Sequence, residues 1–162
     1  MSTTLDRARS FDRRSRARAQ APCSAPQPLA GERDLAVVDT TWGTIQPLVL
    51  ADGVRTVGEL ELIDLVREGA VLVDTRVPDS RWGITLPGAL AIPHTEVVER
   101  RGEFPIDRLA ILFCNGPQCG QTPDAVHKLL DAGLAPRRIA YYRGGLHDWM
   151  TMALPTEDVC PA

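Results

Sequence analysis

The sequence predicts a single α/β domain with a mostly parallel central sheet and helices on both faces. The chain has 162 residues, the length of one domain of ordinary size, and 44% of them are hydrophobic, which is enough to build a core. Short apolar runs typical of buried strands alternate with segments whose apolar residues have helical spacing. Strands that alternate with helices along a chain form parallel sheets covered by helices on both sides.

The N-terminal part of the chain differs in composition from the rest. Residues 1–20 contain six arginines and two aspartates, a net charge of +4, whereas the whole chain carries −3, so the remaining residues carry −7. Residues 18–34 are rich in Pro and Ala without a period, which is typical of a linker. We therefore expect four parts: a disordered Arg/Pro/Ala-rich segment over residues 1–34, an extended lead-in over 35–55, the folded domain over 56–156 and a C-terminal tail over 157–162.

Neither a secretory signal nor a membrane span is evident in the sequence. A signal peptide needs an apolar core of about 7–15 residues, and a membrane-spanning helix needs about 20 apolar residues. The sequence contains no such stretch. The Arg-rich leader is the one feature of the sequence that favours nucleic-acid binding. The small number of aromatic residues and the acidic domain argue against it. We expect a cytoplasmic protein that binds neither membrane nor nucleic acid.

The first helix is expected within residues 56–69. Its apolar positions approximate helical spacing: Leu60, Ile63, Leu65 and Val66. Thr56, followed three residues later by Glu59, fits a capping box, and Gly69 can end the helix. These signals predict a helix that starts directly after the extended lead-in.

Four later segments contain apolar runs that predict strands. In chain order they are residues 70–76, 86–94, 108–114 and 137–145. A short helix is expected over 95–104 and another over 146–155. Strand and helix thus alternate to the end of the domain.

The best-marked helix is expected over residues 122–133. Thr122 is a suitable N-cap, Pro123 suits the first helical position, Asp124 favours the first turn, and Gly133 can end the helix. Its apolar stripe is expected to consist of Ala125, Val126, Leu129 and Leu130. This helix should pack one face onto the sheet.

Three side chains that can take part in chemistry follow predicted strands directly. Asp74, Cys114 and Arg143 each lie at or just past the end of one. In open parallel sheets, ligands bind beyond the carboxyl ends of the strands. We therefore expect these residues to share one edge of the sheet.

The segment from Cys114 to the helix can form a cradle for an anion. Gly116 and Gly120 permit backbone conformations that turn N–H groups inward, and the helix N-terminus adds positive potential. Such a cradle lowers the pKa of a thiol from about 8.5 and so favours the nucleophilic thiolate. The candidate nucleophiles are Cys114 and Cys119. The candidate anion-binding residues are Asn115, Gly116, Pro117, Gln118, Gly120, Gln121 and Thr122.

The cysteines also allow structural and metal-binding interpretations. A cysteine that ends a strand, like Cys114, is often only a small buried hydrophobic residue. Cys119 lies in a turn and has little core to fill. A zinc site needs three or four ligands, and neither this pair nor the three histidines have suitable spacing. We expect no metal, no cofactor and no specific role for Cys23 or Cys160.

Five segments together resemble the rhodanese-like domain family over roughly residues 56–156. In order they are AVLVDTR, LPGALAIPH, ILFCNGPQCGQT, AVHKLLDAG and YYRGGLHDW. The resemblance implies a sulfurtransferase. A cysteine of this family takes sulfur from a sulfane-sulfur donor such as thiosulfate, forms a persulfide, and passes the sulfur to a thiophilic acceptor, which could be a protein.

The resemblance also implies roles for individual residues. Cys114 matches the family nucleophile, and Asp74 with Arg76 matches an Asp-x-Arg pair that supports the edge of the site. Arg143 is a candidate for holding an anionic substrate. Structural roles are implied for Gly144, Gly145 and Trp149.

The cysteine loop departs from the family pattern. It looks about two residues longer, Gln121 stands where a family arginine is usual, and the segment 114–122 holds no cation. Thiosulfate, a dianion, is therefore a doubtful donor, and Cys119 could occupy the centre of the cradle. Two alternatives to a sulfurtransferase stay open: a non-catalytic protein-binding or regulatory module, and a redox-linked sulfur carrier in which one cysteine resolves the other.

Overall fold

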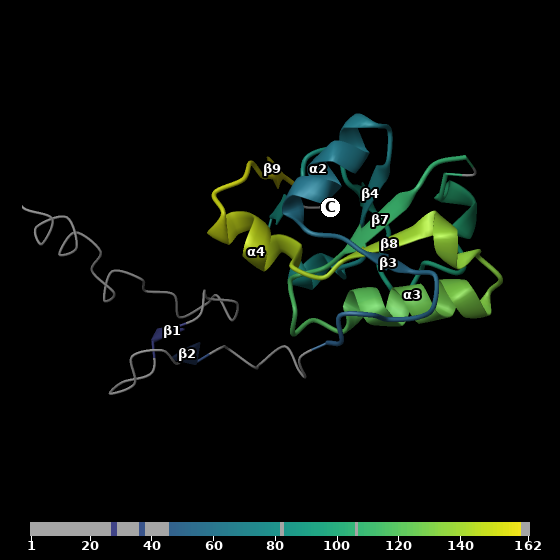
Figure 1. The fold of residues 1–162 in the computed structure, drawn as a ribbon, viewed down its shortest axis with the longest axis horizontal. Helices are drawn as coiled ribbons and strands as arrows, with labels where there is room; N and C mark the ends of the chain where they lie inside the picture. Colours follow the sequence, from purple (N-terminus) through teal and green to yellow (C-terminus); the bar gives the residue numbers. More distant parts are fainter. Residues whose placement is uncertain (1–26, 29–35, 38–45, 82, 106, 160–162) are drawn as a thin grey trace, which may run out of the picture. The chain divides into compact units, whose positions relative to one another are not determined.

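The computed structural model describes residues 27–28, 36–37, 46–81, 83–105 and 107–159 (Figure 1). The chain divides into two compact units, Met1–Thr41 and Trp42–Ala162. In the first unit, β1 (Gln27–Pro28) pairs antiparallel with β2 (Ala36–Val37). Most of the segment expected to be disordered lies outside the described residues, and the four boundaries proposed above remain predictions.

The second unit is built on a parallel five-stranded sheet in the order β3-β8-β7-β4-β6. Its strands are β3 (Arg55–Thr56), β4 (Val71–Asp74), β6 (Leu90–Ala91), β7 (Ala110–Phe113) and β8 (Ile139–Tyr142). Separately, β5 (Ile84–Thr85) pairs antiparallel with β9 (Glu157–Asp158), so the expected C-terminal tail begins with a paired strand. The predicted α/β class with a mostly parallel sheet is confirmed.

Helices cover both faces of this sheet, as predicted (Figure 1). They are α2 (Glu59–Arg67), α3 (Gln121–Asp131) and α4 (Gly145–Thr151), with 3₁₀ turns η2 (Pro78–Ser80), η3 (Arg101–Glu103) and η4 (Pro136–Arg138). Side chains alternate across a strand, so Leu112 packs on the α3 face and Ile111 on the face of α2 and α4. Two cores result, one on each side of β7.

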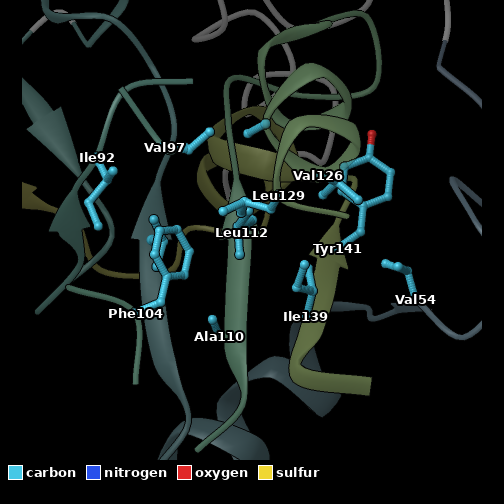
Figure 2. Packing of buried hydrophobic residues seen from close by; sticks show 12 residues of the cluster. Val54, Ile92, Val97, Phe104, Ala110, Leu112, Val126, Leu129, Ile139 and Tyr141 are labelled. Carbon is cyan, nitrogen blue, oxygen red and sulfur yellow. The ribbon is translucent and has the colours of Figure 1, made fainter. Parts of the chain in front are cut away.

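The core on the α3 face joins the middle of the sheet to the buried stripe of that helix (Figure 2). Ala125, Val126 and Leu129 are buried there and Leu130 is partly buried, as predicted. Figure 2 shows Tyr141 of β8 beside Val126, with its hydroxyl oxygen at the end of the ring away from Ile139. The core on the α3 face therefore contains one hydroxyl group, that of Tyr141, among apolar side chains.

The expected stripe and N-cap of α2 are wrong in part. Leu60 is 74% exposed and Val66 is also exposed, whereas Leu62 is the buried residue of the helix. Thr56 lies in β3, where its hydroxyl donates to the Leu48 carbonyl, so it cannot cap the helix. The helix begins at Glu59, three residues after the end of β3, and buries Leu62 in place of Leu60. Gly69 ends it with a φ of +103°, as predicted.

Two further expectations about helices are wrong. Residues 95–104 form turns and η3 instead of an α-helix, because the β-branched pair Val97 and Val98 and the glycine at 102 disfavour one. The major helix α3 begins at Gln121 and has Gly120 at its N-cap. This N-cap lies two residues before the predicted one, Thr122. Thr122 therefore lies inside the helix, and the cysteine loop is two residues shorter than expected.

None of the helices in the described part of the chain is long and apolar enough to cross a membrane.

Candidate active site

The cysteine loop, residues 114–120, joins β7 to α3 at the carboxyl edge of the sheet. The strand register aligns Asp74, Phe113 and Tyr142. Cys114 and Arg143 follow the last two directly, so the predicted common edge is confirmed by the register. Within the loop, the Cys119 N–H donates to the Gly116 carbonyl at 2.9 Å, which closes a tight turn.

The start of α4 holds the base of this loop. The N–H groups of Leu146 and His147 donate to the carbonyls of Cys114 and Asn115 at 3.0 and 2.8 Å. Gly145 has a φ of +58°, and a Cβ built on it would lie 2.4 Å from the Cys114 carbonyl oxygen. Only glycine allows this approach without a shift of the backbone. This gives a physical reason for Gly145 in the segment YYRGGLHDW.

Asp74 and Arg76 form a buried ion pair beneath the loop. Arg76 Nε and Nη2 donate to Asp74 Oδ1 and Oδ2 at 2.9 and 2.7 Å, and both side chains are almost fully buried. Thr85 Oγ1 adds a hydrogen bond of 2.7 Å to the same carboxylate. Arg76 Nη1 donates to Asn115 Oδ1 at 3.0 Å. The pair thus fixes the position of the residue that follows Cys114.

Gln121 and Thr122 belong to the first turn of α3 and secure it to the sheet edge. Gln121 Oε1 accepts from the Val77 N–H at 2.9 Å. Thr122 Oγ1 lies 2.8 Å from Thr75 Oγ1, and the Thr75 hydroxyl can donate to the Phe113 carbonyl at 2.9 Å. Both side chains predicted to bind an anion therefore have protein partners.

Arg143 reaches the loop through another residue. Its Nε donates to the Gln46 carbonyl at 2.9 Å, and the Gln46 N–H donates to the Pro117 carbonyl at 2.7 Å. Residue 46 thus lies across the loop and beside the guanidinium expected to hold a substrate. No local sequence pattern indicates the contact between Gln46 and Arg143, because the two residues lie 97 positions apart.

The two thiols lie together inside the loop. Cys114 is 2% exposed and Cys119 is 4% exposed, and Cys114 Sγ lies 3.4 Å from the Cys119 carbonyl oxygen. A hydrogen bond from the Cys114 thiol lowers the pKa of Cys119 to about 6 against the opposing effect of burial, with further contributions from the N–H groups of Gln121 and Asn115. Burial raises the pKa of the Cys114 thiol well above its usual value. The two pKa values are thus shifted in opposite directions, which favours the thiolate on Cys119 and the proton on Cys114.

Two buried polar groups near the thiols have no hydrogen-bond partner among the described residues. One is the amide of Gln118, which is 2% exposed, and the other is the hydroxyl of Tyr141. Burial raises the pKa of Tyr141, and the negative charge of the thiol pair raises it further, which places the ring near the thiols. Sequence reasoning missed Tyr141. The only available signal was its position two residues before Arg143 on a predicted strand.

No three His, Cys, Asp or Glu side chains in the described ranges come together in a way that could hold a metal ion. His94 Nδ1 pairs with Asp124 Oδ2 at 2.5 Å, on the outer part of α3. His127 Nε2 lies 3.3 Å from the Leu50 carbonyl oxygen, and His147 Nδ1 lies 3.0 Å from Asp148 Oδ1.

Comparison with known proteins supplies the family. A model of the rhodanese-like domain matches residues 60–152, more than half of the chain. The chain belongs to the rhodanese-like domain family. This rhodanese-like domain is 32% identical over 114 residues to a protein of Mycobacterium tuberculosis named as an HTH-type transcriptional regulator. The match covers 70% of the chain and 49% of that relative, so the chain spans about half the relative's length.

Solved structures show the same fold. A protein of Bacillus halodurans matches with a TM-score of 0.57 at 20% identity, covering 64% of this chain and 77% of that one. A rhodanese-related protein of Thermoplasma volcanium matches at 0.52 and 22% identity over 64% and 97% of the two chains. A thiosulfate sulfurtransferase of Pseudomonas aeruginosa matches at 0.51 and 26% identity over 65% of this chain and 20% of its own. The predicted family and fold are thus confirmed, while the roles of individual site residues remain predictions.

Proposed function

We propose that this rhodanese-like domain is a sulfurtransferase that forms a persulfide on a cysteine of the loop. The observation that carries the proposal is the buried thiol pair, in which the pKa of Cys119 is lowered to about 6, chiefly by the hydrogen bond from Cys114. A thiolate is the nucleophilic form of cysteine. Similarity to a thiosulfate sulfurtransferase supports the same reaction class.

The first step is a nucleophilic displacement at sulfur. The Cys119 thiolate attacks the sulfane sulfur of a donor R–S–SH, a new S–S bond forms on Cys119, and the donor's S–S bond breaks to release R–S⁻. The N–H groups of Asn115 and Gln121, which favour the thiolate, are placed to stabilise the persulfide anion as well. A thiophilic acceptor, a small molecule or a protein thiol, then removes the outer sulfur.

The charges around the loop favour a donor of low charge. The segment 114–122 contains no Lys or Arg. Each nitrogen of the Arg76 guanidinium already donates to protein oxygens, among them those of Asp74, Asn115 and Ile84. The loop therefore has no Lys or Arg side chain of its own that could bind a dianion such as thiosulfate. We infer that organic persulfides or hydropolysulfides are better donors.

A regulatory role is a second candidate, and one observation favours it. The relative from Mycobacterium tuberculosis is named as a transcriptional regulator. In this interpretation the domain reports sulfane sulfur to a partner instead of turning it over. Persulfide formation on the loop would then occur once, without repeated transfer to an acceptor.

The test is the intact mass of the reduced Cys114→Ser variant, in which a second loop thiol cannot react with the persulfide, after incubation with a sulfane-sulfur donor. We expect a gain of about 32 Da, one sulfur atom, that cyanide removes, and a faster reaction with glutathione persulfide than with thiosulfate. Multiple turnovers with an acceptor thiol would separate the sulfurtransferase from the regulatory module. Absence of the adduct with every donor tested would refute both interpretations.

A further inference from the structure

The second loop thiol has no assigned part in transfer by a single cysteine. The turn closed by the Cys119 N–H and the Gly116 carbonyl folds the loop back on itself. Cys114 Sγ thereby comes within 3.4 Å of the Cys119 carbonyl oxygen, which accepts a hydrogen bond from the Cys114 thiol. The Cys114 side chain also acts on the second thiol, because it lowers the pKa of Cys119. The α4 N–H bonded to the Cys114 carbonyl holds that backbone in place. The loop therefore presents two thiols to each other and holds them there.

Burial of both side chains makes their encounter favourable after sulfur has been loaded. With 2% and 4% of their surfaces exposed, Cys114 and Cys119 have little contact with solvent. A persulfide on Cys119 would lie close to the Cys114 thiol, whereas an external thiol would first have to reach the buried loop. Reacting groups held in contact have effective concentrations far above those of solutes in solution. An internal reaction is therefore expected to outrun attack by an external acceptor.

We propose that Cys114 resolves the Cys119 persulfide and releases hydrogen sulfide, so that the loop reduces sulfane sulfur as well as carrying it. This proposal rests on persulfide formation as proposed above. Its substrate class is a low-molecular-weight persulfide or hydropolysulfide, whose sulfane sulfur is the oxidant.

The step balances in atoms and electrons. Cys114 Sγ attacks the inner sulfur of the persulfide, the S–S bond between Cys114 and Cys119 forms, and the bond to the outer sulfur breaks. The outer sulfur leaves as HS⁻ and takes up the proton of the Cys114 thiol. The outer sulfur gains two electrons, and the two cysteines lose two as they become a disulfide. A low-molecular-weight dithiol restores both thiols by exchange and is itself oxidised.

The order of the two cysteines follows from their surroundings. Cys119 receives N–H donors from two backbone positions and carries the charge, which suits the first attack on an external donor. Cys114 lies at the end of β7 and keeps its proton, which suits the second step, where a proton must be delivered to the leaving sulfide. A carrier that depends on one cysteine would not need this second thiol.

The test compares three full-length proteins, all carrying Cys23→Ser and Cys160→Ser so that only the loop thiols remain. They are the otherwise unchanged chain, Cys114→Ser and Cys119→Ser. Each is reduced, freed of reductant and mixed with one equivalent of glutathione persulfide. Released sulfide is trapped and quantified, and the intact mass is measured under non-reducing conditions after thiol blocking.

The proposal predicts about one equivalent of sulfide and a loss of about 2 Da, one disulfide, for the chain with both loop thiols. Cys114→Ser should instead keep a stable gain of about 32 Da and release little sulfide, because serine cannot form the disulfide. Cys119→Ser should react at least about tenfold more slowly with the donor, because the buried Cys114 thiol is protonated.

Two negative results have different meanings. If the chain with both thiols keeps the added sulfur and releases no more sulfide than Cys114→Ser, resolution by Cys114 is refuted while persulfide formation stands. If none of the three proteins gains sulfur or releases sulfide, persulfide formation itself fails, and this inference fails with it.

Discussion

At the scale of single residues, the loop holds two thiols in different protonation states. The Cys114 thiol donates a hydrogen bond that lowers the pKa of Cys119 to about 6, and burial raises the pKa of Cys114 itself. Neither effect depends on a cation within the loop. The guanidinium of Arg76, outside the loop, also lowers the pKa of Cys119, but the hydrogen bond from Cys114 is the largest cause.

The pH dependence of Cys119 reactivity tests this hydrogen bond. With Cys23 and Cys160 replaced by serine, the rate of alkylation by iodoacetamide should rise with pH through a midpoint near the pKa of about 6. A charge-assisted hydrogen bond contributes about 1.5–3 kcal/mol, so Cys114→Ala should raise the midpoint by roughly one unit or more. Cys114→Ser keeps a donor and should raise it less. Equal midpoints in all three proteins would contradict the assignment.

The buried ion pair beneath the loop is the second residue-scale feature with a measurable consequence. Arg76→Met should remove the hydrogen-bonded cation of the buried Asp74 carboxylate and leave it only Arg81, whose Nε lies 3.8 Å from Oδ2. The loss of a buried partner of this kind costs up to about 3–5 kcal/mol. The matched control is Arg67→Met, which removes an ion pair to Asp64 whose side chains are both more than two-thirds exposed and should cost less than about 1 kcal/mol. Urea denaturation measures both free energies of unfolding. Similar losses would show that the Asp74 pair is not the support described above.

At the scale of elements, the molecule depends on short strands and on the exact start of each helix. The strands were predictable because runs such as 109–114 are apolar throughout and strand β7 is buried on both faces. The start of α2 was not, because Thr56 satisfies the capping pattern but its hydroxyl donates to the Leu48 carbonyl, eight residues earlier in the chain. Contacts of this kind override local capping signals.

The two leucines of α2 test the corrected orientation of that helix. Leu62 is 1% exposed and packs in the core below α2 and α4, whereas Leu60 is 74% exposed. Leu62→Ala should therefore lower the free energy of unfolding by about 2–5 kcal/mol. Leu60→Ala should change it by less than about 0.5 kcal/mol. The opposite ranking in thermal or urea unfolding would restore the orientation expected from the sequence.

At the scale of the whole molecule, the parallel sheet brings Asp74, Cys114 and Arg143 to one edge, and this much could be predicted from strand order and register. The inward direction of the Cys119 side chain could not, because it depends on the turn at Gly116. The contact of Gln46 with Pro117 could not either, because no local pattern links residues so far apart in sequence. Sequence therefore located the site, and the fold determined how its two thiols are arranged.

The central claim, that a loop cysteine takes up sulfane sulfur, is tested most directly on one peptide. Trypsin cleavage after Arg108 and Lys128 releases residues 109–128, which contain Cys114 and Cys119 and no other cysteine. With Cys114→Ser to prevent resolution, this peptide should gain about 32 Da after treatment with glutathione persulfide, with fragment ions that place the added sulfur on Cys119. An unmodified peptide after the donor has been consumed, or sulfur found only on Cys23 or Cys160, would contradict the account.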